Sequence, residues 1–277
     1  MKLTYLGTGG GAGIPELFCS CEICQNARVA QGQELRNRSM ALINDDLCID
    51  LPCDARNSML FHHVDPRKLK YFLITHNHYD HFMPDNFINR PADVQQMELY
   101  ISSGSGKAFA DRCSKLRETA ANGMRPINIP QVFFISPFET VTMGQYTITA
   151  LPANHDKAIE CLNFIITDGE RSILWLHDTG TLLQETWDYL EENRPKFEIV
   201  SMDCSFPHGA NSKTEHMDIL QCEEQIEMLR GMECLNDSAL VFLSHIGHNV
   251  NATHVDLSIE ATKYNFLVAY DGLQVTI

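Results

Sequence analysis

Basic residues are scarce in this sequence, and their scarcity limits the partners it can have. Its 277 residues include 21 Lys and Arg against 36 Asp and Glu, so the formal net charge is −15. A surface this acidic repels phosphate backbones, and we therefore expect no broad contact with nucleic acid. A small anionic substrate remains allowed, because a few cations or metal ions can reverse the field inside a cleft.

Long apolar runs are absent as well. The N-terminal stretch MKLTYLGTGGG is too short in apolar residues for a secretory signal, and no later stretch approaches the roughly 18 apolar residues of a membrane span. We therefore expect no membrane association and a cytoplasmic location. In that reducing compartment, the ten cysteines suggest metal binding before disulfides.

No linker, low-complexity tract or repeat divides the chain, and short strand-like runs recur along it. We predict one α/β domain over residues 1–277, in which helices cover sheets. The predicted strands are 3–6, 40–43, 47–50, 71–75, 98–102, 131–135, 146–151, 163–167, 172–176, 198–202, 240–244 and 266–269. The predicted helices are 107–119, 181–193, 217–230 and 254–263.

Metal-binding residue types are densest directly after one predicted strand. An apolar run ends at Thr75, and His76, His78, Asp80 and His81 follow within six residues. Imidazole and carboxylate bind divalent ions such as zinc, iron and manganese. Because alternate side chains diverge, we predict that His76 and His78 serve one ion, and that Asp80 and His81 serve a second ion nearby. Two such ions could activate a bridging water and neutralise a phosphoryl oxygen.

This His-x-His-x-Asp-His string at a strand end resembles the signature of the metallo-β-lactamase superfamily. The resemblance implies an αββα sandwich with a metal centre at one edge of two sheets. It also implies further ligands at later strand ends, and the sequence offers three in the expected order. These are His155 for the first site, Asp178 as the bridge between both ions, and His245 for the second site.

The thiols cluster once, in a segment from about residue 13 to 30 that we expect to be a loop. Three of them lie within six residues, namely Cys19, Cys21 and Cys24. Three thiolates and one further ligand make a closed tetrahedral site for a structural zinc ion. We choose His248 as the fourth ligand, because it closely follows the last active-site ligand. A redox switch is the alternative, and the segment could also contribute to the surface of a homodimer.

A narrower resemblance covers nearly the whole chain. Several stretches are similar to the phosphoribosyl 1,2-cyclic phosphate phosphodiesterases of the carbon–phosphorus lyase pathway. The shared landmarks are the glycine run 7–11, the cysteine motif, and the stretches 202–205, 214–218 and 269–272. This resemblance implies a role in phosphonate catabolism, and it also implies His248 as the zinc partner of the cysteines. The sequence departs from the pattern at His177, where a small or hydroxyl residue is expected.

The predicted function is therefore hydrolysis of a small cyclic phosphate, phosphoribosyl 1,2-cyclic phosphate, by metal-activated water. The expected cofactors are two divalent ions, which could be Mn, Zn, Fe or Ni. Asp80 should bind a metal and orient the nucleophile, and the resemblance implies His216 as the proton donor. His208 could reach a substrate phosphate. The run of glycines at 9–11 is expected to form a tight turn that brings backbone close to the metals.

The sequence is also compatible with three other functions. An RNA-processing phosphodiesterase, such as a tRNA 3′-end nuclease, would need a basic surface or arm, which this acidic chain lacks. A lactonase, thioesterase or lactamase is compatible, because the same metals hydrolyse acyl bonds. A non-enzymatic carrier, like the relative implicated in pyrroloquinoline quinone handling, would be favoured by missing ligands, but here the set is complete.

Overall fold

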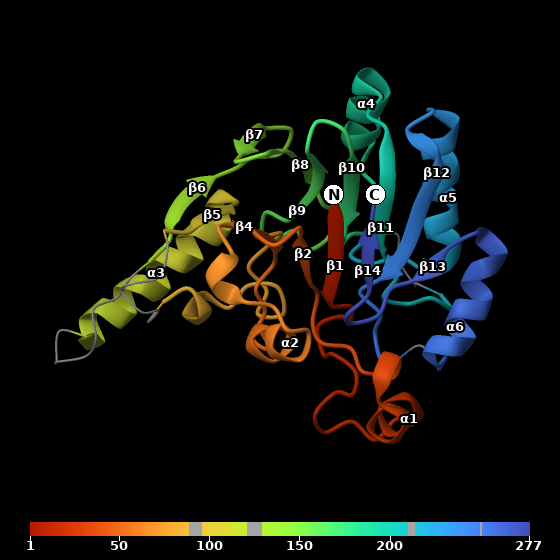
Figure 1. The fold of residues 1–277 in the computed structure, drawn as a ribbon, viewed down its shortest axis with the longest axis horizontal. Coiled ribbons are helices and arrows are strands. Elements are labelled where there is room, and N and C mark those ends of the chain that lie inside the picture. Colours follow the sequence, from red (N-terminus) through yellow and green to blue (C-terminus); the bar gives the residue numbers. More distant parts are fainter. Residues whose placement is uncertain (89–95, 121–128, 210–213, 250) are drawn as a thin grey trace.

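Two seven-stranded sheets pack face to face and carry helices on their outer faces (Figure 1). The computed structural model describes residues 1–88, 96–120, 129–209, 214–249 and 251–277. The layers follow the order helix, sheet, sheet, helix. This architecture confirms the predicted αββα sandwich.

The first sheet holds the N-terminal strands and the second sheet the later ones. In spatial order the first contains β14 (Gln274–Thr276), β1 (Lys2–Gly7), β2 (Met40–Ile43), β3 (Leu47–Ile49), β4 (Tyr71–Leu73), β5 (Glu98–Ile101) and β6 (Gln131–Phe134). The second contains β13 (Leu267–Val268), β12 (Leu235–Ser244), β11 (Phe197–Asp203), β10 (Ser172–Leu176), β9 (Leu162–Thr167), β8 (Tyr146–Pro152) and β7 (Thr140–Met143).

Helices cover the outer face of each sheet. Buried side chains of α2 (Ala55–Phe61) and α3 (Ser103–Ala120) pack on the first sheet. The second sheet is covered by α1 (Glu22–Ala30), α4 (Gln184–Asn193), α5 (Ile219–Gly231) and α6 (His254–Ala261). Short 3-10 turns complete the structure, namely η1 (Gly32–Glu34), η2 (Pro66–Lys68), η3 (Pro84–Asn86) and η4 (Thr262–Tyr264).

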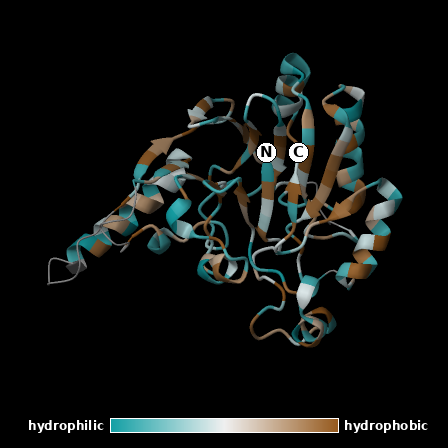
Figure 2. Ribbon diagram, in the orientation of Figure 1, coloured by the Kyte–Doolittle hydropathy of each residue, from teal (hydrophilic) through white to brown (hydrophobic). Residues whose placement is uncertain are grey.

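The central core lies between the two sheets, and the alternation of side chains along strands explains it. In β1, Leu3 and Tyr5 face this core, whereas Leu6 faces the helices of the first sheet. Tyr5 stacks on the buried Trp175 with ring centroids 5.9 Å apart. Hydrophobic residues accordingly concentrate on the strands, and hydrophilic ones on the outer parts of the helices (Figure 2).

Some elements were not predicted, and each has a physical reason. The strands β7 and β14 lie at sheet edges and are partly exposed, so they lack a strong apolar pattern. The segment around the cysteines was expected to be a loop, but α1 begins at Glu22. Its N-cap is Cys21, whose thiol accepts a hydrogen bond from the N–H of Cys24. A thiol is an uncommon cap, so residue patterns do not reveal it.

Among the described residues, no helix has the length and apolar character needed to cross a membrane.

A buried carboxylate ties the turn before β14 to the end of β1 and to the segment before β2. Asp271 accepts hydrogen bonds from the N–H and hydroxyl of Thr8 at 2.9 and 2.7 Å. It also accepts bonds from the backbone and side-chain N–H groups of Asn37 at 2.6 and 3.0 Å. The Arg36 guanidinium adjoins this network through the Thr8 hydroxyl, 2.8 Å away. Burial raises the pKa of Asp271 to about 6, against the opposing effect of these bonds.

Substituting this aspartate tests the network. We expect Asp271→Ala to lower the free energy of unfolding by about 3–5 kcal/mol, because buried donors and the Arg36 charge lose their partner. Urea denaturation at pH 8, where the wild-type carboxylate is ionised, measures the change. The control is Asp45→Ala, whose side chain is 65% exposed and should cost less than about 1 kcal/mol. Equal effects of the two substitutions would contradict this account.

Candidate metal centre

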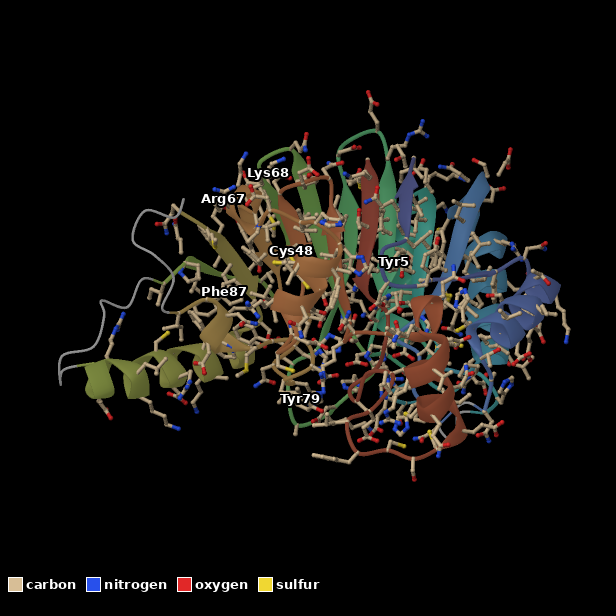
Figure 3. All side chains as sticks on the ribbon, turned by 60° about the horizontal axis from the view of Figure 1, so that its bottom comes forward. Tyr5, Cys48, Arg67, Lys68, Tyr79 and Phe87 are labelled. Carbon is tan, nitrogen blue, oxygen red and sulfur yellow. The ribbon has the colours of Figure 1, made fainter. Side chains whose placement is uncertain are left out.

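The predicted metal ligands gather at one edge of the sandwich because their strands point the same way. Pairing along the second sheet makes β8, β10, β11 and β12 mutually parallel, so their carboxyl ends share one edge. His155, Asp178 and His245 follow three of these ends, and the histidine-rich segment follows β4 of the first sheet. Tyr79, inside that segment, marks this edge in Figure 3.

The seven predicted ligands form two groups that share Asp178. Within each group, the possible ligand atoms all lie within 4.8 Å of one another. The first group is His76, His78, His155 and Asp178. The second group is Asp80, His81, Asp178 and His245. The pairing predicted from the sequence, with His76 and His78 in one group and Asp80 and His81 in the other, is the one that the fold produces.

Distances in the first group suit one metal ion. The Nε2 atom of His76 lies 2.9 Å from Nδ1 of His78, which lies 3.4 Å from Nε2 of His155. Oδ2 of Asp178 lies 3.2 Å from His76 Nε2. Nitrogens bound tetrahedrally to zinc are about 3.3 Å apart, given zinc–nitrogen bonds of about 2.0 Å. The first group is therefore nearly in coordination geometry.

The second group is similarly tight and contains an unsatisfied acceptor. Nε2 of His81 lies 3.3 Å from Nε2 of His245 and 2.8 Å from Oδ2 of Asp178. Oδ1 of Asp178 is buried and accepts no hydrogen bond from the described residues, although His245 Nε2 lies 2.9 Å away. A buried carboxylate oxygen without a hydrogen bond is costly. A divalent cation between these atoms would remove that cost, so the residues fit the metals that the fold implies.

Each histidine has its second ring nitrogen held by another group. These contacts fix the ring orientations, as outer-shell partners of metal ligands do. The closest is between Nδ1 of His81 and Asp50 Oδ2, at 2.6 Å. The others are Thr75 Oγ1 with His76, Asp156 Oδ2 with His78, the Glu215 carbonyl with His155, and Ser205 Oγ with His245, at 3.0, 3.3, 3.1 and 2.8 Å.

Carboxylates dominate the electrostatics of this edge. Burial opposes a charge on His245, but Asp178 and Asp203 outweigh burial and raise its pKa to about 10. Burial likewise opposes ionisation of Asp80, yet the neighbouring His81 holds its pKa well below the usual range. The edge thus attracts positive charge, and a metal ion bound there would compete with protons.

The glycine run after β1 brings backbone against the second group, as predicted. A Cβ on Gly11 would lie 3.2 Å from Oδ2 of Asp80, and one on Gly10 would lie 3.4 Å from the His245 ring. A side chain at Gly11 would press on the Asp80 carboxylate, which would have to shift by a few tenths of an ångström, whereas one at Gly10 would only touch the His245 ring. The close approach thus favours glycine at position 11.

His216 lies next to both groups, with its ring centroid 5.2 Å from that of His155 and 5.5 Å from that of His245. Its Nδ1 is 2.9 Å from Oδ2 of Asp203 and 3.5 Å from Oδ1 of Asp178. Burial would lower the pKa of His216, but the charge and hydrogen bond of Asp203 outweigh this effect and raise it. Its side chain is 22% exposed, so the ring still reaches solvent.

Sequence reasoning assigned no role to Asp50, Asp156 or Asp203. Asp50 and Asp203 are fully buried at the ends of β3 and β11. A carboxylate at the end of an otherwise apolar strand was the available signal for both. Asp156 directly follows the predicted ligand His155, and that adjacency was its signal.

The cysteine group also comes together with its predicted histidine. The ligand atoms of Cys19, Cys21, Cys24 and His248 lie within 4.8 Å of one another. Nδ1 of His248 is 3.5 Å from the Cys19 sulfur and 3.7 Å from that of Cys21, close to the edge of about 3.6 Å expected around tetrahedral zinc. Burial would raise the thiol pKa of Cys21, but hydrogen bonds from His248 and the Cys24 N–H lower it to about 6.

Two further histidines take other positions. His177 is buried beneath the metal centre, where its ring nitrogens lie 2.9 Å from Ser39 Oγ and 2.8 Å from Ser201 Oγ. Its ring also stacks on Trp175, with centroids 3.8 Å apart. Nδ1 of His208 lies 3.4 Å from Glu260 on α6, and the potential metal groups of the described residues do not include it.

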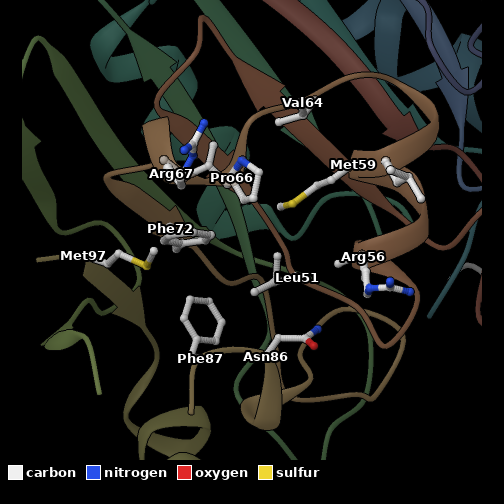
Figure 4. A pocket seen from close by; sticks show the side chains of 13 residues that line it. Leu51, Arg56, Met59, Val64, Pro66, Arg67, Phe72, Asn86, Phe87 and Met97 are labelled. Carbon is white, nitrogen blue, oxygen red and sulfur yellow. The ribbon is translucent and has the colours of Figure 1, made fainter. Parts of the chain in front are cut away.

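A separate apolar cavity of about 580 Å³ lies on the outer side of the first sheet (Figure 4). Its lining includes Leu51, Met59, Phe72 and Phe87, and none of its lining residues is a candidate metal ligand. This cavity is therefore separate from the candidate metal ligands, which lie at the sheet edge.

Residues 50–246 match the model of the beta-lactamase superfamily domain, and the chain belongs to this family. With its paired histidine and aspartate groups, the fold defines a metal-dependent hydrolase of the metallo-β-lactamase type.

Individual relatives are more distant. Over 282 aligned residues, the chain is 24% identical to a curated octanoyltransferase of Porphyromonas gingivalis, with 100% of this chain and 52% of that protein covered. The chain thus spans about half the length of the curated relative it matches.

Solved structures with the same fold cover nearly the whole chain. A diphosphatase from the PhnP family has a TM-score of 0.74 at 18% identity, covering 100% of this chain and 97% of its own. Zn(2+)-bound PqqB from Methylobacterium extorquens has a TM-score of 0.74 at 16% identity, covering 100% of both chains. The short form of human tRNase Z has a TM-score of 0.69 at 14% identity, covering 100% and 99%.

Removing the shared carboxylate tests the paired site. We expect Asp178→Ala to lose both active-site ions, because each group loses one ligand and the ions lose their common neutralising charge. Elemental analysis after loading with Mn²⁺ and dialysis measures the metal content. Asp168→Ala, a substitution in the turn between β9 and β10, is the control and should keep both ions. Retention of two ions by Asp178→Ala would contradict the shared-ligand arrangement.

Proposed function

We propose that this protein is a phosphodiesterase that hydrolyses a small cyclic phosphate, and that phosphoribosyl 1,2-cyclic phosphate is its substrate. The observation that carries the proposal is the position of His216 beside the two metal groups. Opening a cyclic phosphate releases an alkoxide, which needs a proton, whereas the metals supply the other requirements of the reaction.

Seven residues of this chain would hold the two metal ions. The first metal would be held by His76, His78, His155 and Asp178, and the second by Asp80, His81, Asp178 and His245. When bound, the two ions supply Lewis acidity, which makes hydroxide available near neutral pH and neutralises charge on the phosphoryl group. Asp80, beside Gly11, would bind its ion and help orient the attacking group.

His216 would donate the proton. Asp203 holds the Nδ1 side of its ring at 2.9 Å, which leaves Nε2 to face the leaving oxygen. Burial lowers the pKa of His216, but the adjacent Asp203 carboxylate outweighs burial and raises it, which favours the protonated ring. The backbone positions the ring as well, because the N–H of Glu215 donates to the Asn154 carbonyl at 2.8 Å. The proton donor is therefore tied to the loop that carries His155.

The comparisons lend support at the level of reaction class. One neighbour in fold is a diphosphatase from the PhnP family, and another is a human tRNase Z. The landmarks of the glycine run and cysteine motif support the narrower substrate and a role in phosphonate catabolism.

The leaving group tests the role of His216. We expect His216→Ala to retain its metals and to lose about 100-fold or more in kcat on ribose cyclic phosphates, whose alkoxide needs a proton. The same variant should stay within about threefold of wild type on bis(p-nitrophenyl) phosphate, because nitrophenolate leaves without protonation. An equal loss on both substrates would remove His216 from the role of proton donor. Wild-type activity on lactones or thioesters, with none on any phosphodiester, would overturn the proposed function.

Acyl hydrolysis is the second candidate, and the octanoyltransferase relative is the observation that favours it. The match covers about half of that protein, so this candidate ranks below the phosphodiesterase. An octanoyl thioester in the substrate panel tests it directly. A precursor tRNA belongs in the same panel, although the net charge of −15 argues against RNA as substrate.

We also propose that the cysteine group binds a structural zinc ion. Besides the sulfur–nitrogen distances, Nε2 of His248 lies 3.2 Å from the Glu16 carboxylate, which would orient the ring. Leu17 and Phe18 on the same segment are 78% and 94% exposed, and this supports a homodimer contact there. None of the ten cysteines, all of which lie among the described residues, forms a disulfide, and this supports a cytoplasmic location.

A cysteine substitution tests the zinc proposal. We expect Cys21→Ser to lose one zinc equivalent and to melt at a lower temperature, because zinc binding and folding of this segment are coupled. The active-site metals should remain. Elemental analysis and thermal melting measure both effects, and Cys53→Ser, an exposed cysteine outside the group, is the matched control. Unchanged zinc content in Cys21→Ser would refute the zinc site, and a disulfide in the wild type would favour the redox alternative.

A further inference from the structure

One arginine beside the metal centre has no part in the proposed hydrolysis. Nε of Arg38 donates to the carbonyl of Gly11 at 2.9 Å, and the other side of Gly11 faces Asp80. Asp54 accepts a second bond from this guanidinium through one oxygen, at 3.2 Å. The Arg38 side chain is 22% exposed. It is therefore a fixed cation separated from the second metal group by one residue of backbone.

Comparison with Arg36 shows that Arg38 has spare hydrogen-bonding capacity. Arg36 is buried and donates to Thr8, to the Ala269 carbonyl and toward His254. Its donors hold the fold together. Arg38, two residues later, uses two of its five side-chain N–H groups on Gly11 and Asp54 and also interacts with the Tyr79 hydroxyl, which leaves at least two N–H groups for a ligand.

An aromatic ring and a cavity adjoin the free side of this arginine. The guanidinium lies 5.3 Å from the centre of the Tyr79 ring, and the Tyr79 hydroxyl donates to the same Gly11 carbonyl at 3.0 Å. Tyr79 is 56% exposed. A cavity of about 550 Å³ is lined by Arg38 together with Ala12, Asp54, His62 and Tyr270. It is large enough for part of a small substrate.

We propose that Arg38 binds the phosphate monoester that the enzyme does not cleave, at the far end of a sugar cyclic phosphate. This inference rests on the proposed function and names the substrate feature that the site selects. The cyclic phosphate would lie at the metals, and the sugar would pass Gly11 along the exposed Tyr79 ring. Arg38 would then hold the terminal phosphate by charge-assisted hydrogen bonds.

Arg38 supplies the positive charge that a phosphate needs here. Asp54 lies 3.2 Å from the Arg38 guanidinium and Asp80 lies against Gly11, so a phosphate with two negative charges can bind only beside this cation. Asp54 accepts a hydrogen bond from the guanidinium through one oxygen only. It therefore orients Arg38 without occupying all of its N–H groups. A planar guanidinium with parallel free N–H groups matches two oxygens of one phosphate.

The test compares two substrates that differ in this phosphate, namely ribose 1,2-cyclic phosphate with and without a 5-phosphate. We expect the metal-loaded wild type to prefer the 5-phosphorylated form through a lower KM. Arg38→Gln should raise that KM about tenfold or more and leave kcat within about twofold. The KM for the form without the 5-phosphate, and the kinetics on bis(p-nitrophenyl) phosphate, should not change.

Arg67→Gln is the matched control. Arg67 also pairs with an aspartate, Asp65, at 2.8 Å, but lies far from Tyr79 at the other end of the strands (Figure 3). This variant should keep the wild-type preference. Metal content and melting temperature of both variants show whether each is folded.

A measurement on the wild type alone decides the question if Arg38→Gln does not fold. Ribose 5-phosphate should inhibit hydrolysis of bis(p-nitrophenyl) phosphate at least about tenfold more strongly than ribose 1-phosphate does. Equal inhibition, no preference between the two cyclic phosphates, or an equal loss on all substrates in Arg38→Gln would overturn the inference while leaving the phosphodiesterase intact. A wild type without phosphodiesterase activity would overturn both.

Discussion

The buried carboxylate of Asp178 is the interaction on which the rest of this structure depends. Its oxygens lie 3.2 and 2.8 Å from His76 and His81, and 2.9 Å from His245. The segments after β4 of the first sheet and β12 of the second sheet therefore converge on the side chain that follows β10. The arrangement places several buried polar groups around one negative charge, and it is stable in water only if positive charge compensates them. The folded structure of this edge and the binding of metal ions therefore depend on each other.

The backbone at this edge is strained in the places where function needs it. Asp50, Asp178, Glu215 and His245 have positive φ angles of 60, 47, 73 and 58°, although none is glycine. Left-handed backbone at such residues costs energy and persists where surrounding contacts fix it. Here the fixing contacts are hydrogen bonds such as that from Thr75 to Asp50. The packing of the strands offsets the energy of the left-handed backbone and holds the reacting groups in place.

The sequence was most informative where chemistry demanded a dense pattern. The string from His76 to His81 predicted the fold family and the two groups, and the order of the later ligands followed from the resemblance. The carboxylates that hold the histidine rings in place were not predictable in the same way. Asp50 and Asp203 are each single residues in strands, and their partners lie 31 and 13 residues away. Likewise, the helix capped by Cys21 depends on a thiol hydrogen bond that no periodicity reveals.

The central prediction is that Asp178 joins two ions at the sheet edge, and a single measurement tests it directly. Anomalous diffraction from crystals loaded with Mn²⁺ would locate the ions without reference to activity. The account predicts two peaks about 3.5–4 Å apart, on either side of the Asp178 carboxylate. One peak alone, or two peaks with Asp178 bound to neither, would contradict it.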